Sequence, residues 1–192
     1  MSAIHETRAW LEKAVIGLNL CPFAKAVHVR GQIRWVLSDA TDTAALLQQL
    51  VLELQHLAAA DPLIVDTTLI VHPGVLQDFL DFNDFLGLAE DALADLGLEG
   101  VLQIASFHPD YRFADAAPDD IANFSNRSPQ PTLHLLREDS IARAVQAVPD
   151  AADIYERNIE TLEKLGLEGW RALLSAPDAT AADPTAPASS GR

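Results

Sequence analysis

Apolar and polar positions along the chain follow two spacings, one typical of helices and one typical of strands. Residues 4–20 and 43–60 repeat apolar residues every three or four positions, which predicts helices with one buried face. Residues 33–38 alternate with period two, which predicts a strand. The elements predicted in this way, in chain order, are helix 4–20, strand 33–38, helix 43–60, strand 63–71, helix 75–96, strand 101–107, strand 132–136 and helices 138–147 and 150–165.

The order of these elements predicts the fold class. A succession of strand, helix, strand, helix and strand favours βαβ crossovers and a partly parallel sheet. We therefore expect an α/β fold, with α+β as the alternative, built as a two-layer or three-layer sandwich. Its four-stranded mixed sheet would have a βαβαβ core and flanking helices. Residues 1–174 are expected to form this single globular domain, and residues 175–192 a disordered tail, because they contain almost nothing that could pack.

Composition and charge restrict the class of partner. Hydrophobic residues make up 49% of the chain and charged residues 21%, which is typical of a soluble globular protein. The net charge of −15 repels phosphate backbones, so no nucleic acid partner is expected. No run approaches the roughly 20 apolar residues that span a bilayer, so no membrane partner is expected. One cysteine, Cys21, and an N-terminus without a secretory signal indicate a cytoplasmic protein.

Polar and ionisable residues gather between residues 107 and 138, where one predicted strand ends and the next begins. This segment holds two His, three Arg and four Pro. A loop of about 20 residues in a compact domain usually has a functional role. The sequence therefore predicts that the functional site lies in this segment.

Two predicted strands end in a His-Pro step, at His72-Pro73 and at His108-Pro109. Ligands of open α/β sheets bind beyond the carboxyl ends of the strands. If the two strands are parallel neighbours, both imidazoles emerge at one edge, about 5 Å apart in strand spacing. They could then form a metal site or an acid–base pair. Alternatively, each His caps its strand and bonds to a loop, which is the favoured interpretation for His72.

His108 and Asp110 form the predicted catalytic pair. A carboxylate two residues away can orient an imidazole and raise its basicity. Arg112 follows, and its planar guanidinium suits a carboxylate or a phosphate. The alternative is a cluster of Asp, His and Arg that only stiffens the loop.

A second group of polar residues is predicted to bind substrate with Arg112. Asn and Ser accept unusual turns, and Arg can bind an anion with two parallel hydrogen bonds. The alternative is that these side chains satisfy backbone groups of a long loop. His134, on a predicted strand, points either to the core or to the same site, and a satisfied core histidine is the favoured interpretation. The residues of this second group are Asn123, Asn126, Arg127 and Ser128.

Cys21 lies in the segment Leu20-Cys21-Pro22-Phe23-Ala24. Ala24 stands where a redox partner cysteine would be, which argues against thiol redox chemistry. Cysteine and histidine are zinc ligands, so Cys21, His72 and His108 are the candidate ligands of a divalent metal cofactor. The spacing matches no known metal motif, and buried packing is the favoured interpretation for Cys21. The GxGxxG, P-loop and GxSxG motifs are also absent from the sequence.

Three blocks of the sequence resemble an uncharacterised bacterial family, domain of unknown function number 1415. The similarity covers about residues 5–174 and implies a small single-domain protein, without implying a reaction or a cofactor. The three blocks are Leu18 to Ala24, Phe107 to Phe113, and Asn126 to Glu138.

Two functions follow from these observations. The first is a small cytosolic enzyme that acts on a polar or anionic metabolite by acid–base or metal-assisted chemistry, with His108 as base or ligand. The second is a non-catalytic protein that binds a small ligand or a protein partner through the same segment.

Overall fold

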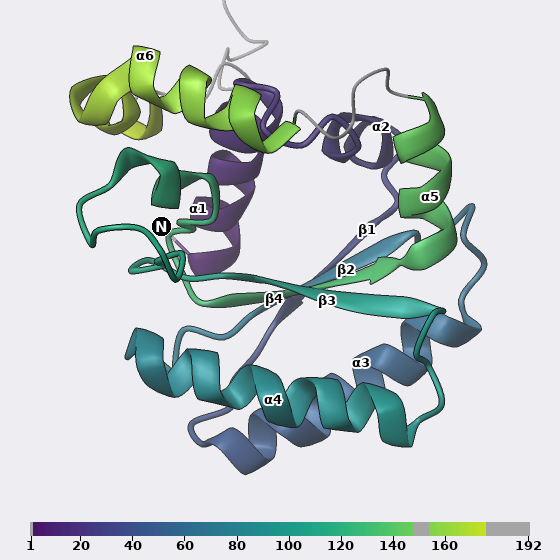
Figure 1. Ribbon diagram of the computed structural model, residues 1–192. Helices are drawn as coiled ribbons and strands as arrows, with labels where there is room; N and C mark the ends of the chain where they lie inside the picture. Colours follow the sequence, from purple (N-terminus) through teal and green to yellow (C-terminus); the bar gives the residue numbers. More distant parts are fainter. Residues whose placement is uncertain (1, 148–153, 176–192) are drawn as a thin grey trace, which may run out of the picture.

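The computed structural model describes residues 2–147 and 154–175, which form a four-stranded sheet with helices on both faces (Figure 1). The strands follow the order β1-β2-β4-β3. β1 pairs with β2 in parallel, and β4 runs antiparallel to both of its neighbours. The predicted α/β fold with a four-stranded mixed sheet is therefore confirmed, in its three-layer form. The strands are β1 (Ile33–Leu37), β2 (Thr67–Val71), β3 (Leu102–Phe107) and β4 (Thr132–Arg137).

The helices divide between the two faces of the sheet. In Figure 1, α3 and α4 lie below the sheet, and α1, α2, α5 and α6 lie above it. The helices are α1 (Ala3–Trp10), the π-helix η1 (Leu11–Ile16), α2 (Ala24–Val29), α3 (Thr43–Ala59), α4 (Phe79–Asp95), the 3₁₀ helix η2 (Ile121–Ser125), α5 (Glu138–Ala147) and α6 (Ile154–Ser175).

The face under α3 and α4 holds the larger core. α3 places a leucine on this face at nearly every turn, because residues four apart in a helix share one side. α4 adds two phenylalanines, and the strands add every second residue. Burying these side chains is the main favourable term for the fold. The fully buried members from α3 are Leu46, Leu50, Leu54 and Leu57.

The opposite face has a smaller core, built from both ends of the chain. Trp10 of α1 contacts Phe107 of β3 edge to face, with ring centroids 5.1 Å apart. Trp170 of α6 contacts Phe124 of η2 in the same way at 5.4 Å. Leu162 of α6 is fully buried in this cluster. The N-terminal and C-terminal helices therefore hold the polar segment against the sheet.

Helix 4–20 and strand 63–71 of the prediction differ from the observed elements. Helix 4–20 divides into α1 and η1, and its buried face follows Thr7, Trp10 and Ala14. Strand 63–71 begins only at Thr67, because the carbonyl of Asp61 accepts the backbone N–H groups of residues 64 and 65 and holds a turn. Leu63 is consequently 80% exposed.

The predicted helix 150–165 is confirmed from residue 154, where α6 begins. α6 bends at Gly166, whose φ of 65° is incompatible with a regular helix, where the predicted helix 150–165 ends. Residues 150–153 of that helix and residues 176–192 of the predicted tail lie outside the described residues. The single-domain boundary at residue 174 stays a prediction. Within the described ranges, no helix is long and apolar enough to cross a membrane.

The position of β4 changes the expected edge of the sheet. β2 and β3 point in the same direction, but β4 lies between them. The strands that end at His72 and His108 are therefore not neighbours, and they lie two strand spacings apart instead of one. The two imidazoles nevertheless approach each other through the turn that follows β2.

Candidate functional site

His108 is fully buried and both of its ring nitrogens are hydrogen-bonded to backbone groups. Nδ1 accepts the N–H of Asp110 at 3.0 Å, so the ring proton is on Nε2, which donates to the carbonyl of Leu76 at 3.2 Å. Burial lowers the pKa of His108, and the Leu76 carbonyl and the Asp110 carboxylate offset part of that shift. A base role for His108 stays a prediction, and it would require one of these backbone bonds to be exchanged.

His72 stabilises the same turn from the neighbouring side. Its Nδ1 lies 3.2 Å from the carbonyl of Val75, and its ring stacks on Phe82, which also contacts His108. Burial lowers the pKa of His72 to about 4. The turn needs such support because Leu76 has a φ of 58°, which costs free energy for a residue with a branched side chain.

The three candidate metal ligands do not meet at one place, because Cys21 lies on the other face of the sheet from His72 and His108. Cys21 packs into the cluster of Trp10 and Leu162, above the sheet. His72 and His108 contact Phe82 of α4, below the sheet. In the described part of the chain, no three His, Cys, Asp or Glu side chains are grouped to hold a metal ion.

The amide and hydroxyl groups of the predicted substrate-binding run bond to their own loop. Asn123 is fully buried, where it accepts the N–H of Phe113 at 3.0 Å and donates to Ala117 at 2.8 Å. Asn126 donates to the carbonyl of Ser106, and Ser128 donates to that of Gln130. These bonds match the alternative interpretation, in which the side chains satisfy backbone groups.

Three of the predicted site residues do line one depression, which we call the loop depression. Asp110, Arg112 and Arg127 surround it with Asp78 and Phe79 from the start of α4, and its volume is about 400 Å³. The Arg127 guanidinium donates to the carbonyls of Tyr111, at 3.1 Å, and Pro118, at 2.6 Å. Arg112 is exposed beside it and is the better placed of the two for an anion.

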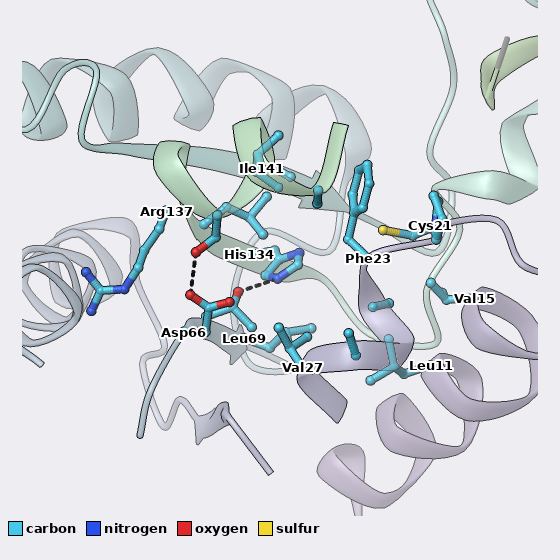
Figure 2. Close-up of a pocket in the computed structure, with 18 of the residues that line it drawn as sticks. Leu11, Val15, Cys21, Phe23, Val27, Asp66, Leu69, His134, Arg137 and Ile141 are labelled. Carbon is cyan, nitrogen blue, oxygen red and sulfur yellow. Dashed lines mark hydrogen bonds between the residues drawn. The ribbon is translucent and has the colours of Figure 1, made fainter. Parts of the chain in front are cut away.

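A larger cavity lies on the other face of the sheet, and we call it the sheet cavity. Its volume is about 520 Å³. β2, β3 and β4 form one wall, and η1, α2 and α5 form the others (Figure 2). Most of its lining is apolar, including Leu11, Val15, Phe23, Val27, Leu69, Phe107 and Ile141.

Two hydrogen-bonded pairs of polar side chains interrupt the apolar lining, and Arg30 and Arg143 also line the cavity. Thr67 and His134 approach to 2.6 Å between the hydroxyl and Nε2, and the Ser140 hydroxyl donates to Asp66 at 2.6 Å (Figure 2). Burial lowers the pKa of His134 to about 4, so its ring is neutral near pH 7. Arg137 points away from the cavity in the same view, where it donates to carbonyls at the end of α3.

Cys21 lies in the wall of the sheet cavity beside Phe23 (Figure 2). Burial raises the pKa of its thiol, although the N–H groups of Phe23 and Ala24 act in the opposite direction. A protonated thiol is a weak nucleophile and a poor metal ligand. Cys21 is half-buried in this wall, and its packing role stays a prediction.

Comparison with known protein families identifies the family of this chain. The family model described as Protein of unknown function (DUF1415) matches residues 2–172. The chain belongs to this family. No curated protein and no solved structure matches the chain significantly.

In this DUF1415 protein, sequence reasoning named Cys21 and His134 but did not predict the cavity that they line. His134 lies 26 positions after His108 in the sequence. The alternation along β4 predicts which face of the sheet His134 occupies, but not which elements pack against that face. Thr67 lies three positions after the exposed Ile64. The predicted strand 63–71 included both residues, so the sequence did not identify Thr67 as the first residue of β2. One signal was available: a histidine among the apolar residues of a central strand needs a polar partner on the same face.

Proposed function

We propose that this protein binds a small, largely apolar molecule in the sheet cavity. The observation that supports this proposal is the combination of about 520 Å³ of volume, apolar walls and two polar pairs. Small-molecule sites typically enclose roughly 300–1,000 Å³ and have mainly apolar linings with a few placed polar groups. The apolar lining supplies binding free energy, and the polar pairs fix the orientation of the ligand.

The elements around the cavity support a built site. The pair Thr67 and His134 joins β2 and β4 at the centre of the sheet, where the backbone is hydrogen-bonded on both sides. The second pair joins Asp66, directly before β2, to Ser140 of α5. Sites on strands hold their geometry better than sites on loops. α2 and α5, which are shorter than α3 and α4, lie on the solvent side of the cavity.

Thermal-shift screening with small apolar compounds tests this proposal, because a ligand of the folded state raises its melting temperature. Ala144→Phe, on the cavity side of α5, is expected to fill the cavity and remove the shift. Ala142→Phe, at an exposed position of the same helix, is the matched control and keeps the shift. Compounds that stabilise both variants equally would place binding elsewhere.

The loop depression supports a second candidate function, the binding of a polar or anionic metabolite. Arg112, Arg127 and Asp110 line one surface of about 400 Å³, so a ligand anion could approach two guanidinium groups. An enzyme acting there would use Asp110 as its exposed acid–base group, with His108 beneath it. The cavity remains the better supported site because Arg127 already donates to two carbonyls.

Substitution of Arg112 tests this second function. Arg112→Gln is expected to weaken binding of small carboxylates and inorganic phosphate by about tenfold, since a hydrogen bond to a charged group contributes roughly 1.5–3 kcal/mol. Calorimetric titration measures the loss. Arg157→Gln, an exposed residue of α6, is the matched control. Equal affinities of the two variants would exclude the depression as the anion site.

A further inference from the structure

We propose that Nδ1 of His134 accepts a hydrogen bond from the ligand of the sheet cavity, so that this ligand is an apolar molecule with an N–H or O–H group. The inference rests on the proposed function of the cavity and adds the chemical class of its ligand. It gives His134 a role in recognition instead of packing.

The proton positions around Thr67 determine which nitrogen of His134 carries a hydrogen. The Thr67 hydroxyl lies 2.6 Å from the carbonyl of Leu135, which can only accept. The single hydroxyl proton is therefore committed to that carbonyl. The contact of 2.6 Å between the hydroxyl and Nε2 of His134 then requires Nε2 to donate. Nδ1 consequently carries a lone pair.

The neighbours of His134 leave that lone pair to the cavity. On the same face of the sheet, Leu69 of β2 and Ala105 of β3 lie beside it in register, and neither has a polar side-chain atom. Phe107 contacts the ring at 6.0 Å between centroids and offers no N–H or O–H. Among the residues that the structure describes, none forms a hydrogen bond with Nδ1. Nδ1 is also not fully enclosed by protein atoms.

Figure 2 shows where this nitrogen points. The dashed bond leaves one side of the His134 ring, and the other nitrogen faces the side on which Phe23 and Cys21 lie. That side is the interior of the cavity. The ring stays neutral near pH 7 because its pKa is about 4, so Nδ1 remains an acceptor.

The environment makes this acceptor selective. A ligand that fills the cavity displaces water from Nδ1, and a ligand without a donor leaves it unpaired in apolar surroundings, which opposes binding. A ligand with an N–H or O–H group at that position replaces the lost bond. Sites of this kind reject analogues that lack the matching group more strongly than they reject a change of size.

A matched pair of probes tests the inference on the full chain. Indole carries one N–H donor, and 1-methylindole has the same ring system with the donor removed. Calorimetric titration is expected to show that indole binds at least about tenfold tighter than 1-methylindole. In His134→Phe the two probes are expected to bind equally, because the acceptor is replaced by an apolar ring.

A second variant and a spectroscopic measurement cover the case in which His134→Phe does not fold. Thr67→Val keeps the side-chain shape but cannot accept from Nε2, so the preference for indole is expected to shrink. Nitrogen NMR of the histidine ring in the wild-type protein is expected to show a proton on Nε2 and none on Nδ1. A proton on Nδ1 would overturn the inference, whatever ligand binds.

The outcomes separate this inference from the function on which it rests. Equal binding of both probes to the wild-type protein, abolished by Ala144→Phe, would retain the cavity as a binding site and overturn the role of His134. Binding of neither probe would overturn the binding function and the ligand class together.

Discussion

At the scale of single residues, three histidines explain much of the local structure, two of them fully buried and the third facing the sheet cavity. His72 and His108 support the turn before α4, and His134 pairs with Thr67 across the sheet. The pKa of all three rings is lowered for the same reason, because burial disfavours the charged form of the imidazole. Their neutral state is part of the folded structure, and this gives the protein a specific response to acid.

The free energy of unfolding is expected to fall as the pH falls from 6.5 toward about 4, and to stay level above that window. The pKa of His72 and of His134 is about 4 in the folded state, against 6.5 without the fold. The unfolded chain therefore binds protons first in this window, which favours unfolding. Each histidine contributes a loss of about 2 kcal/mol by about pH 5. Urea unfolding at a series of pH values measures it.

A pair of variants identifies the groups responsible. His134→Gln is expected to reduce the loss between about pH 7 and about pH 5, because one of the titrating rings is removed. His56→Gln, at an exposed position of α3, is the matched control. An identical loss in both variants would attribute the acid response to other groups.

At the scale of elements, α3 shows how local and distant residues share one helix. Its start is local, because Asp42 accepts the N–H of Ala45 at 2.8 Å. Its end is distant, because Arg137 of β4 donates to the carbonyls of Leu57 and Ala60. The first contact is between near neighbours in the chain, as is usual for an N-cap. The second joins residues 80 positions apart and leaves no signal in the sequence.

Removing the Asp42 cap is expected to destabilise the protein by about 1 kcal/mol, the usual cost of an N-cap replaced by alanine. Denaturant unfolding of Asp42→Ala measures the loss. Asp42→Asn keeps a side-chain oxygen at the same place and is expected to retain most of the stability. A loss of similar size in both variants would show that the charge, not the hydrogen bond, stabilises this end of α3.

Strand limits illustrate why some elements could not be predicted. Residues 63–65 are as apolar as the strand that follows, but the carbonyl of Asp61 holds them in a turn. The side-chain amide of Gln32 donates to the carbonyls of Pro62 and Leu63 and fixes the turn against β1. Periodicity reports only how side chains alternate, so it cannot distinguish a strand from an apolar turn of this kind.

At the scale of the whole molecule, the insertion of β4 between β2 and β3 divides the chemistry of the protein between two faces. His72, His108 and the loop depression lie with α4, and His134 and Cys21 lie with the sheet cavity. The predicted site residues therefore gather only in part: Asp110, Arg112 and Arg127 come together, and Asn123, Asn126 and Ser128 bond to their own loop.

The sequence by itself determined most of the helices and strands, the α/β class and the acidic charge, because each depends on residues near one another or on composition. It did not predict α2 or η2, or the start of β2. It also located the loop where Asp110 and Arg112 meet a ligand-sized depression. Only the tertiary structure decided that His134 faces a cavity and that Cys21 lies on the opposite side of the sheet from His108. Strand order arises from contacts between residues that are distant in the sequence. The same holds for the hydrogen bonds that Thr67 forms with Leu135 and His134. Periodicity along the chain does not encode such contacts.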